Sequence, residues 1–371
     1  MRSSTGYYSE RLDHLRGLAA FLVFMWHFLH QTGVPYAYVP SFAPLSLLEE
    51  GHIGVALFMV LSGYLFQRLC AGHDVSWRHF YANRVLRLAP LMICVWIFYG
   101  VADHRQELAA YAQVLIRGFI TKDWPGGGWS ITAEMHFYLL FPLLFAFSRS
   151  SIRPLLAVLI AAIVLRAGLY ASTGEVQTSA YWTIIGRIDQ FLLGMVFARV
   201  SINRWLLAGG FVLFVVAVHA FNLQGGYYDA PSYPSPRPYW IIWPTIEGLG
   251  FACLISLYER APIKIASRLS KPLRLAGETS YSIYLLHFIY IRYVPFDRML
   301  AQLGVPATPG ALYAAGFAAF VLMLPIAWLS YQLIEKPPLR LRMPYIRGHQ
   351  VDHGAVNTSL SPPELQSSRA R

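Results

Sequence analysis

Charged side chains are scarce in this 371-residue chain. Asp, Glu, Lys and Arg make up 13% of it, whereas the residues AVILMFWYC make up 56% and the aromatic residues alone 15%. A soluble globular domain carries about 25% charged residues, and a single hydrophobic core stops growing at about 250–300 residues. This composition therefore excludes an ordinary soluble enzyme and indicates a membrane protein.

Cysteine is also rare. Cys70, Cys94 and Cys253 form no CxxC pair and fall within or beside apolar segments, so neither a zinc site nor a disulfide framework is indicated, and we expect no metal. The formal charge of +11 comes without a basic run interleaved with stacking aromatic residues, which argues against nucleic acid as a partner. The cations instead stand in small groups between apolar segments, as expected of a chain whose surroundings are membrane lipid.

Apolar segments long enough to cross about 30 Å of hydrocarbon predict an all-α integral membrane protein with ten transmembrane helices. The predicted spans are 14–31, 52–70, 84–102, 129–148, 152–171, 181–199, 204–221, 239–258, 278–295 and 310–334. The first is expected to stay as a helix, because it contains Trp26 and His27 and no small-x-small cleavage pattern follows it. With a cytoplasmic N-terminus, 22 of the 30 Lys and Arg residues fall inside, so the positive-inside rule places both termini in the cytoplasm.

One membrane domain, residues 1–345, is predicted. The tail, residues 346–371, loses apolar periodicity and ends in Ser, Pro, Gln and Arg, so we expect it to be disordered in the cytoplasm. The outer loops are short apart from 103–128 and 222–239, which predicts that no separate extracytoplasmic domain is present.

Ionisable residues inside spans cost at least about 2.5–3.5 kcal/mol each to insert, so each is a candidate functional residue. Asp13, Arg16 and His27 follow spacings of three and eleven, which places them on one helix face. Arg16 would lie at the cytoplasmic edge, with His27 roughly 16 Å deeper. On spacing alone, a topology anchor with an acidic partner and a helix-packing histidine explain the set about as well.

Five segments resemble, in order, those of the acyltransferase-3 family of integral membrane acyltransferases. The first, RLDHLRGLAAFLVFMWHFLH, has ten residues between its key Arg and His, which are Arg16 and His27. The others are LFMVLSGYLF at 57–66 with its Ser-Gly pair, FYANRVLRLAP at 80–90, WSITAEMHFYLLFPLL at 129–144 and GETSYSIYLLH at 277–287. The family's ten-helix core agrees with the span count. Some members append a hydrolase-like domain that is missing here, so the chain would complete transfer in the membrane or pass the group to glycan-assembly proteins.

The resemblance implies acyl-coenzyme A (acyl-CoA), and acetyl-CoA in particular, as the donor. Arg84 and Arg87 share a helix face at the predicted cytoplasmic end of the third span, where two guanidinium groups can hold phosphate oxygens. An isolated pair of this kind more often anchors lipid headgroups. Together with Arg16 they form the predicted donor site, Asp13 is expected to orient Arg16, and Ser62 is taken as a supporting residue.

His27 is the predicted general base, because imidazole transfers protons near neutral pH and a sugar hydroxyl is a poor nucleophile until it is deprotonated. A covalent acyl-His27 intermediate is left open. Glu134, the second predicted catalytic residue, is expected to form an acceptor pocket near the outer surface with Trp129, which can stack on a sugar. The alternative is an interfacial tryptophan, with Glu134 neutralised by Arg166 or Arg187.

Ser280, Tyr284 and His287 share one face of the ninth span and are expected to line the acceptor cavity, although helix–helix hydrogen bonding explains them about as well. Arg187 and Asp189, two residues apart, cannot share a face, and we expect them to be structural partners of other spans.

The predicted function is that of a multi-pass O-acyltransferase of the bacterial inner membrane, and an O-acetyltransferase in particular. It would move an acyl group from cytoplasmic acyl-CoA to a hydroxyl of a cell-envelope or secreted glycan or glycolipid. A secondary transporter of a glycan precursor or organic anion is the alternative, but neither discontinuous helices nor paired halves are visible. A non-catalytic assembly or sensor protein would have no need of Arg84 and Arg87.

Overall fold

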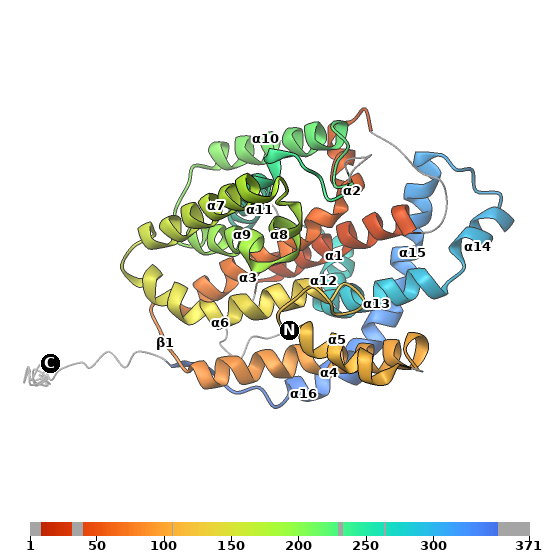
Figure 1. Cartoon of the computed structure of the whole chain (residues 1–371), viewed down its shortest axis with the longest axis horizontal. Helices are drawn as coiled ribbons and strands as arrows, with labels where there is room; N and C mark the ends of the chain where they lie inside the picture. The colour runs from red at the N-terminus through yellow and green to blue at the C-terminus, as the bar shows by residue number, and fades with distance from the viewer. Residues whose placement is uncertain (1–8, 32–39, 106, 229–232, 263–264, 348–371) are drawn as a thin grey trace, which may run out of the picture.

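The computed structural model describes residues 9–31, 40–105, 107–228, 233–262 and 265–347, and nearly all regular structure there is helical. Helices α1 (Glu10–Gln31) and α3 (Gly54–Cys70) pass through the middle of the molecule. In the view of Figure 1 they lie between α10 (Arg204–Leu223) at the top and α4 (Trp77–Asp103) at the bottom.

Helices cover each of the ten predicted spans. The remaining elements are η1 (Ala43–Leu45), α2 (Ser46–Glu49), η2 (Gly51–Ile53), α5 (Leu108–Arg117), α6 (Trp129–Ser150), α7 (Arg153–Thr173), α8 (Gln177–Trp182), α9 (Ile184–Phe197), η3 (Pro238–Ile241), α11 (Trp243–Arg260), α12 (Ser267–Glu278), α13 (Ser280–Tyr293), α14 (Phe296–Gln302), α15 (Pro309–Ser330), η4 (Tyr331–Glu335) and α16 (Lys336–Leu339). Two-residue strands, β1 (Asp74–Val75) and β2 (Ile346–Arg347), pair antiparallel. The all-α prediction is confirmed apart from this one pair.

Six helical segments of the described chain are long and apolar enough to cross a membrane: Gly51–Cys70, Trp77–Asp103, Trp129–Ser150, Arg153–Thr173, Arg204–Leu223 and Pro309–Leu339. The predicted count of ten is therefore confirmed only in part. Of the other four predicted spans, α9 and α13 have only 14 residues each. The remaining two are α11, which carries three charged residues, and α1, which contains Arg16 and three histidines.

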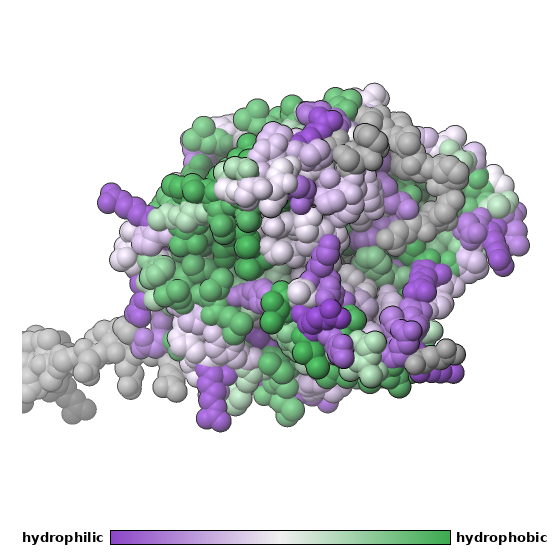
Figure 2. Space-filling view, viewed as in Figure 1, coloured by the Kyte–Doolittle hydropathy of each residue, from purple (hydrophilic) through white to green (hydrophobic). Residues whose placement is uncertain are grey.

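The position of these helices in the bundle explains why they are shorter or more polar than the six candidate membrane spans. In α9, twelve of the 14 residues are buried, whereas α7 and α10 expose large apolar side chains such as Val164 and Leu213. Figure 2 shows hydrophobic residues gathered over α7. A helix surrounded by other helices can satisfy its polar groups with protein partners, but a helix that faces lipid cannot. The apolar outer helices support a multi-pass membrane protein.

Close packing of α3 on α9 depends on two glycines. A Cβ atom at Gly63 would lie 2.0 Å from the carbonyl oxygen of Phe191, and one at Gly194 would lie 2.2 Å from that of Val60. Small residues let membrane helices approach to this distance. The glycine of the Ser-Gly pair therefore fixes α3 against α9, while its neighbour Ser62 lines a cavity on the other side.

The chain beyond α16 returns to the start of α4. Ile346 and Arg347, the first two residues of the predicted tail, pair with Val75 and Asp74. Residues 348–371 lie outside the described residues, so disorder there stays a prediction.

Candidate active site

A cavity of about 100 Å³ lies between α1, α3, α4, α6 and α13. Seven residues predicted for the site line it: Arg16, Ser62, Arg84, Arg87, Glu134, Ser280 and Tyr284. All five sequence segments that resemble the acyltransferase-3 family therefore contribute residues to this cavity, the first of them through Arg16.

Three predicted cationic residues, Arg16, Arg84 and Arg87, line the cavity. Arg16 donates a hydrogen bond from Nη1 to Oδ1 of Asp13 at 2.7 Å, the contact expected if Asp13 orients it. The guanidinium group of Arg84 lies 5.1 Å from the ring centre of Phe66 and 5.9 Å from that of Tyr138. Its Nε atom is buried and has no hydrogen-bond partner among the described residues. An unsatisfied buried donor is costly, so Nε of Arg84 is a candidate donor to a ligand.

Glu134 lies in the same cavity. Its Oε1 atom accepts a hydrogen bond from the hydroxyl of Ser62 at 3.1 Å and another from the hydroxyl of Tyr138. Tyr138 stands four residues after Glu134, and Ser130, another lining residue, stands four residues before it. Both could have been found from helical periodicity, because residues at this spacing share a helix face.

Two buried ion pairs exclude the alternative in which Glu134 is neutralised by Arg166 or Arg187. Arg166 donates to both carboxylate oxygens of Asp189, at 3.1 and 2.6 Å. Arg187 donates to Glu247 at 3.0 Å. Arg187 and Asp189 are therefore structural partners of other helices, as predicted.

Trp129 does not share a pocket with Glu134, and this part of the predicted site is wrong. It is buried against Tyr181 and Trp182, at ring-centre distances of 5.0 and 4.9 Å, with the guanidinium of Arg187 at 5.4 Å from its ring. Five residues along a helix correspond to a rotation of about 140° from face to face. Glu134 therefore faces the arginine-lined cavity, while Trp129 faces α8 and α9.

His27 does not line the cavity; it contacts His287, whose ring lies next to that of the lining residue Tyr284. The two atoms that meet are Nδ1 of His27 and Nε2 of His287, at 3.1 Å. Nδ1 of His27 also lies 2.8 Å from the carbonyl oxygen of Val23, and Nδ1 of His287 lies 2.5 Å from that of Tyr284. A carbonyl oxygen can only accept, so the hydrogen-bond pattern assigns the proton of each neutral ring to Nδ1. Nε2 of His287 is then an acceptor, and Nε2 of His27 keeps a free lone pair.

Tyr284 connects the cavity to the histidine pair. Its hydroxyl accepts a hydrogen bond from Ser130 at 2.6 Å and donates to the carbonyl oxygen of Gly127 at 3.0 Å, while its ring centre lies 5.7 Å from that of His287. The three residues predicted to share one face of the ninth span therefore have different neighbours. Ser280 and Tyr284 line the cavity, whereas His287 contacts His27.

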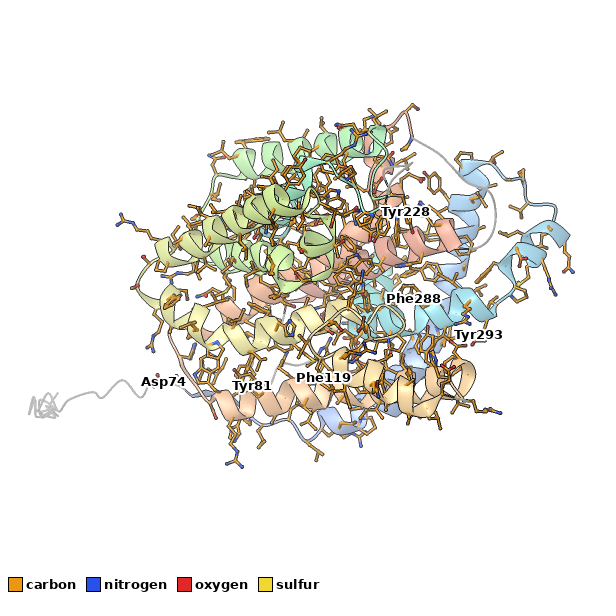
Figure 3. All side chains as sticks on the ribbon, in the orientation of Figure 1. Asp74, Tyr81, Phe119, Tyr228, Phe288 and Tyr293 are labelled. Atoms are coloured by element: carbon orange, nitrogen blue, oxygen red, sulfur yellow. The ribbon has the colours of Figure 1, made fainter. Side chains whose placement is uncertain are left out.

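Phe288 packs against both His27 and His287. The ring centres of Phe288 and His27 are 4.3 Å apart, and Phe288 also fills the space beside Gly127, where a Cβ atom would lie 2.6 Å from it. Figure 3 labels Phe288 on α13 near the middle of the molecule. Neither this contact nor the pairing of His27 with His287 was predicted, because the residues are far apart in sequence.

Comparison with known proteins identifies the family. The model of the family described as acyltransferase domain, the acyltransferase-3 family, matches residues 9–332. The chain is 26% identical over 361 residues to BcsY of Komagataeibacter xylinus, provisionally named a membrane-bound transacylase, a match that covers 88% of this chain and 82% of BcsY. It is 26% identical over 309 residues to the exopolysaccharide production protein ExoZ of Rhizobium meliloti, covering 78% of this chain and 90% of ExoZ.

A third relative is the O-acetyltransferase OatA of Staphylococcus aureus. It is 25% identical over 377 residues, which cover 89% of this chain but only 57% of OatA. No solved structure matches the chain. Because the family model covers most of the sequence, including every cavity residue named above, the protein belongs to the acyltransferase-3 family and is a membrane acyltransferase.

Proposed function

We propose that the protein is an O-acyltransferase of the bacterial inner membrane, and an O-acetyltransferase in particular. It transfers an acyl group from cytoplasmic acyl-CoA to a hydroxyl of a cell-envelope or secreted glycan. The observation that carries the proposal is the arrangement of a free imidazole nitrogen, on His27, beside an arginine-lined cavity, with Tyr284 and His287 between them. The names of OatA and ExoZ, which refer to O-acetyl transfer and exopolysaccharide production, support this choice of donor group and acceptor.

In this proposal Arg84, Arg87 and Arg16 bind the phosphate groups of the donor. The unsatisfied Nε of Arg84 supports an anion there, because a phosphate oxygen would supply the missing acceptor. The cavity volume of about 100 Å³ is small beside the roughly 300–1,000 Å³ of drug-sized ligand pockets, so it can hold only a part of the donor.

His27 acts as general base in the proposed reaction. The acceptor hydroxyl oxygen attacks the thioester carbonyl carbon, and Nε2 of His27 takes the hydroxyl proton. The carbon–sulfur bond then breaks, and the leaving thiolate takes a proton from the imidazolium. During this step Nδ1–H of His27 stays donated to Val23 and His287, which stabilises the positive ring. An acyl-His27 intermediate would use the same nitrogen and remains the alternative.

Glu134 acts at the donor end rather than at the acceptor, because it lies in the cavity with the arginines. Its bonds from Ser62 and Tyr138 hold the carboxylate in place, and its charge limits how deeply the donor phosphates enter. Trp129 has no assigned part in this reaction, because its ring is buried against Tyr181 and Trp182.

Mass spectrometry of envelope and secreted glycans tests the proposed function. Cells that make the wild-type protein should carry O-acyl groups that are missing from cells without it and from cells that make only His27→Gln at normal abundance. Identical glycans in all three would contradict the proposal. Accumulation of an unmodified glycan or organic anion in vesicles, without consumption of acetyl-CoA, would favour the transporter alternative.

A further inference from the structure

A second pocket, about 780 Å³ in volume, lies where α13 ends and α14 begins, on the side of the molecule where Figure 1 labels α14. Its volume falls within the roughly 300–1,000 Å³ of ligand pockets, whereas the arginine-lined cavity of about 100 Å³ is too small for a donor and an acceptor together. The residues that line the second pocket include Tyr99 of α4 and, on α13 and α14, Phe288, Arg292, Tyr293, Asp297 and Arg298. The chain therefore has room for a second ligand outside the cavity.

Helix α13 carries residues of both the arginine-lined cavity and the second pocket. Tyr284 lines the cavity, and Phe288, one turn later, lines the second pocket. His287 lies between them, because its ring centre is 5.7 Å from that of Tyr284 and 4.3 Å from that of Phe288. His287 in turn contacts His27 at 3.1 Å. The histidine pair is therefore flanked by the cavity on one side and by the second pocket on the other.

Phe288 forms the wall between the second pocket and His27, with its ring centre 4.3 Å from that of His27. It also packs against Gly127, where a Cβ atom would lie 2.6 Å from the phenyl ring. The φ angle of Gly127 is 76°, so glycine is needed there for its backbone as well as for the room it leaves. The carbonyl oxygen of Gly127 accepts a hydrogen bond from Tyr284. The loop before α6 therefore contacts both the wall residue and a residue of the cavity.

The second pocket combines aromatic rings with charges of both signs. Arg292 donates to both carboxylate oxygens of Asp103, at 2.7 and 3.1 Å, and its guanidinium carbon lies 5.5 Å from the ring centre of Tyr293, which Figure 3 labels on α13. Asp297 and Arg298 add one further charge of each sign to the lining. A sugar presents an apolar ring face and hydroxyl groups that both donate and accept, so aromatic rings beside carboxylate and guanidinium groups suit it. The two signs are equal in number among these four charged residues, which suits an uncharged sugar better than a phosphate group.

We propose that the second pocket binds a sugar unit of the acceptor glycan, and that the ring of Phe288 turns aside when the acceptor hydroxyl reaches Nε2 of His27. The inference rests on the proposed function, in which His27 deprotonates that hydroxyl. His27 and Phe288 are both half-buried, whereas only 1% of His287 is exposed, so the side of Phe288 is the more accessible approach to the base. With the ring in place, water in the pocket is kept from the base until a sugar is bound.

Replacing Phe288 with alanine tests the wall. Without the ring, a water oxygen attacks the thioester carbonyl carbon, and Nε2 of His27 takes one of its protons. The carbon–sulfur bond breaks to give acetic acid, and the thiolate takes that proton to give free coenzyme A. We expect Phe288→Ala to hydrolyse acetyl-CoA severalfold faster than wild type in the absence of glycan and to lose most of its transfer activity. Phe147→Ala, which removes an exposed ring of α6 outside both the cavity and the pocket, is the matched control and should behave as wild type.

Replacing Arg292 with glutamine tests sugar binding. The acceptor probe is polysaccharide isolated from cells that lack the protein, supplied with labelled acetyl-CoA to purified full-length protein in nanodiscs of zwitterionic lipid. We expect Arg292→Gln to raise KM for the polysaccharide about tenfold or more, since hydrogen bonds to a charged group are strong, and to leave KM for acetyl-CoA unchanged. Arg105→Gln removes an exposed charge two residues from Asp103 and outside the pocket lining, so it should match wild type. Arg84→Gln should give the reverse pattern, with KM raised for acetyl-CoA alone.

Cysteine labelling measures binding without catalysis. In a background that carries Cys70→Ala, Cys94→Ala and Cys253→Ala, a cysteine introduced by Arg298→Cys should react with a membrane-impermeant maleimide. The same polysaccharide should slow this reaction, and coenzyme A should not. Protection by coenzyme A alone would overturn the inference and place the donor in the second pocket.

The remaining outcomes separate this inference from the proposed function. An unchanged KM for polysaccharide in Arg292→Gln, or an equal increase in Arg105→Gln, would overturn the role of the pocket and leave the proposed function intact. So would an effect of Arg292→Gln that occurs only in nanodiscs with anionic lipid, which would assign this residue to lipid headgroups. Wild-type rates of hydrolysis in Phe288→Ala would overturn its role as the wall. Failure of the wild type to transfer any acetyl group to the polysaccharide would overturn both proposals.

Discussion

Replacing His287 with leucine tests whether its imidazole holds the general base in place. The substitution removes the acceptor that lies 3.1 Å from Nδ1 of His27 but leaves the 2.8 Å bond from the same nitrogen to Val23. In the transition state Nδ1–H belongs to a charged ring, and a hydrogen bond to a charged group contributes about 1.5–3 kcal/mol. We therefore expect kcat for acetyl transfer to fall by about 10- to 150-fold, with KM for acetyl-CoA little changed.

The matched control is His287→Gln, whose amide oxygen can accept the same bond. It should keep most of the activity, and both variants should lose a similar, smaller amount of stability, because His287 is buried and its Nδ1 also donates to Tyr284. The assay is steady-state transfer of labelled acetyl groups by purified protein, with thermal unfolding as the stability measurement. Wild-type kcat in His287→Leu, or equal losses in the two variants, would refute the assigned hydrogen bond. Complete loss of activity in His287→Leu would instead identify His287 as the base.

Three further outcomes follow from the same geometry. His27→Ala should abolish transfer at normal membrane abundance, since a smaller apolar residue inserts easily; acylated glycan at the wild-type level would remove His27 from the mechanism. Arg84→Gln should weaken acetyl-CoA binding about 10- to 150-fold, from one charge-assisted contact of about 1.5–3 kcal/mol, and unchanged affinity by titration would return this residue to membrane anchoring. Arg187→Met should destabilise the protein by about 3–5 kcal/mol, because it leaves Glu247 buried without its ion-pair partner. The double variant that also carries Glu247→Met should recover much of that loss in thermal unfolding, and no recovery would argue against the pair.

Local spacing is enough to predict some of the site. Asp13 and Arg16 are three residues apart on one helix, so their hydrogen bond depends on nothing beyond α1. Ser280 and Tyr284 line one cavity because four residues return a helix to the same face. Groups of residues that share a helix face can therefore be identified from the amino-acid sequence alone.

Contacts between distant helices could not be predicted in this way. His27 and His287 are 260 residues apart, and no local pattern indicates which face of α13 meets α1. The same lack of information hid the neighbours of Glu134, which lines a cavity with Arg84 and Arg87 instead of a pocket with Trp129. The ordered pairing of Ile346 and Arg347 with β1 was also missed, because it depends on a contact with residues that are far away in sequence.

Hydropathy identified mainly the helices whose apolar side chains are exposed on the surface of the molecule. Of the six segments that pass a length and apolarity test, Gly51–Cys70 is the exception, because 78% of its apolar window is buried, against 22–50% for the others. α1, α9 and α13 can be shorter or more polar because their neighbours supply hydrogen bonds. These inner helices carry His27, Arg187 and His287. The polar residues that lower the hydropathy of a helix are therefore the ones to examine for a catalytic or a packing role.

Charged residues within the bundle fall into two groups, and their partners distinguish them. Arg166 and Arg187 are each paired with a buried carboxylate, and such pairs stabilise the arrangement of helices without a ligand. Arg84 has aromatic rings around it and a buried Nε with no hydrogen-bond partner among the described residues. An unsatisfied donor alone does not separate these arginines, because Nη2 of Arg187 is also buried without a partner among the described residues. The charge of Arg187 is balanced by Glu247, whereas Arg84 forms no ion pair within the part of the chain that the structure describes. The sequence shows that these arginines are present, and the structure shows which of them are paired with a carboxylate.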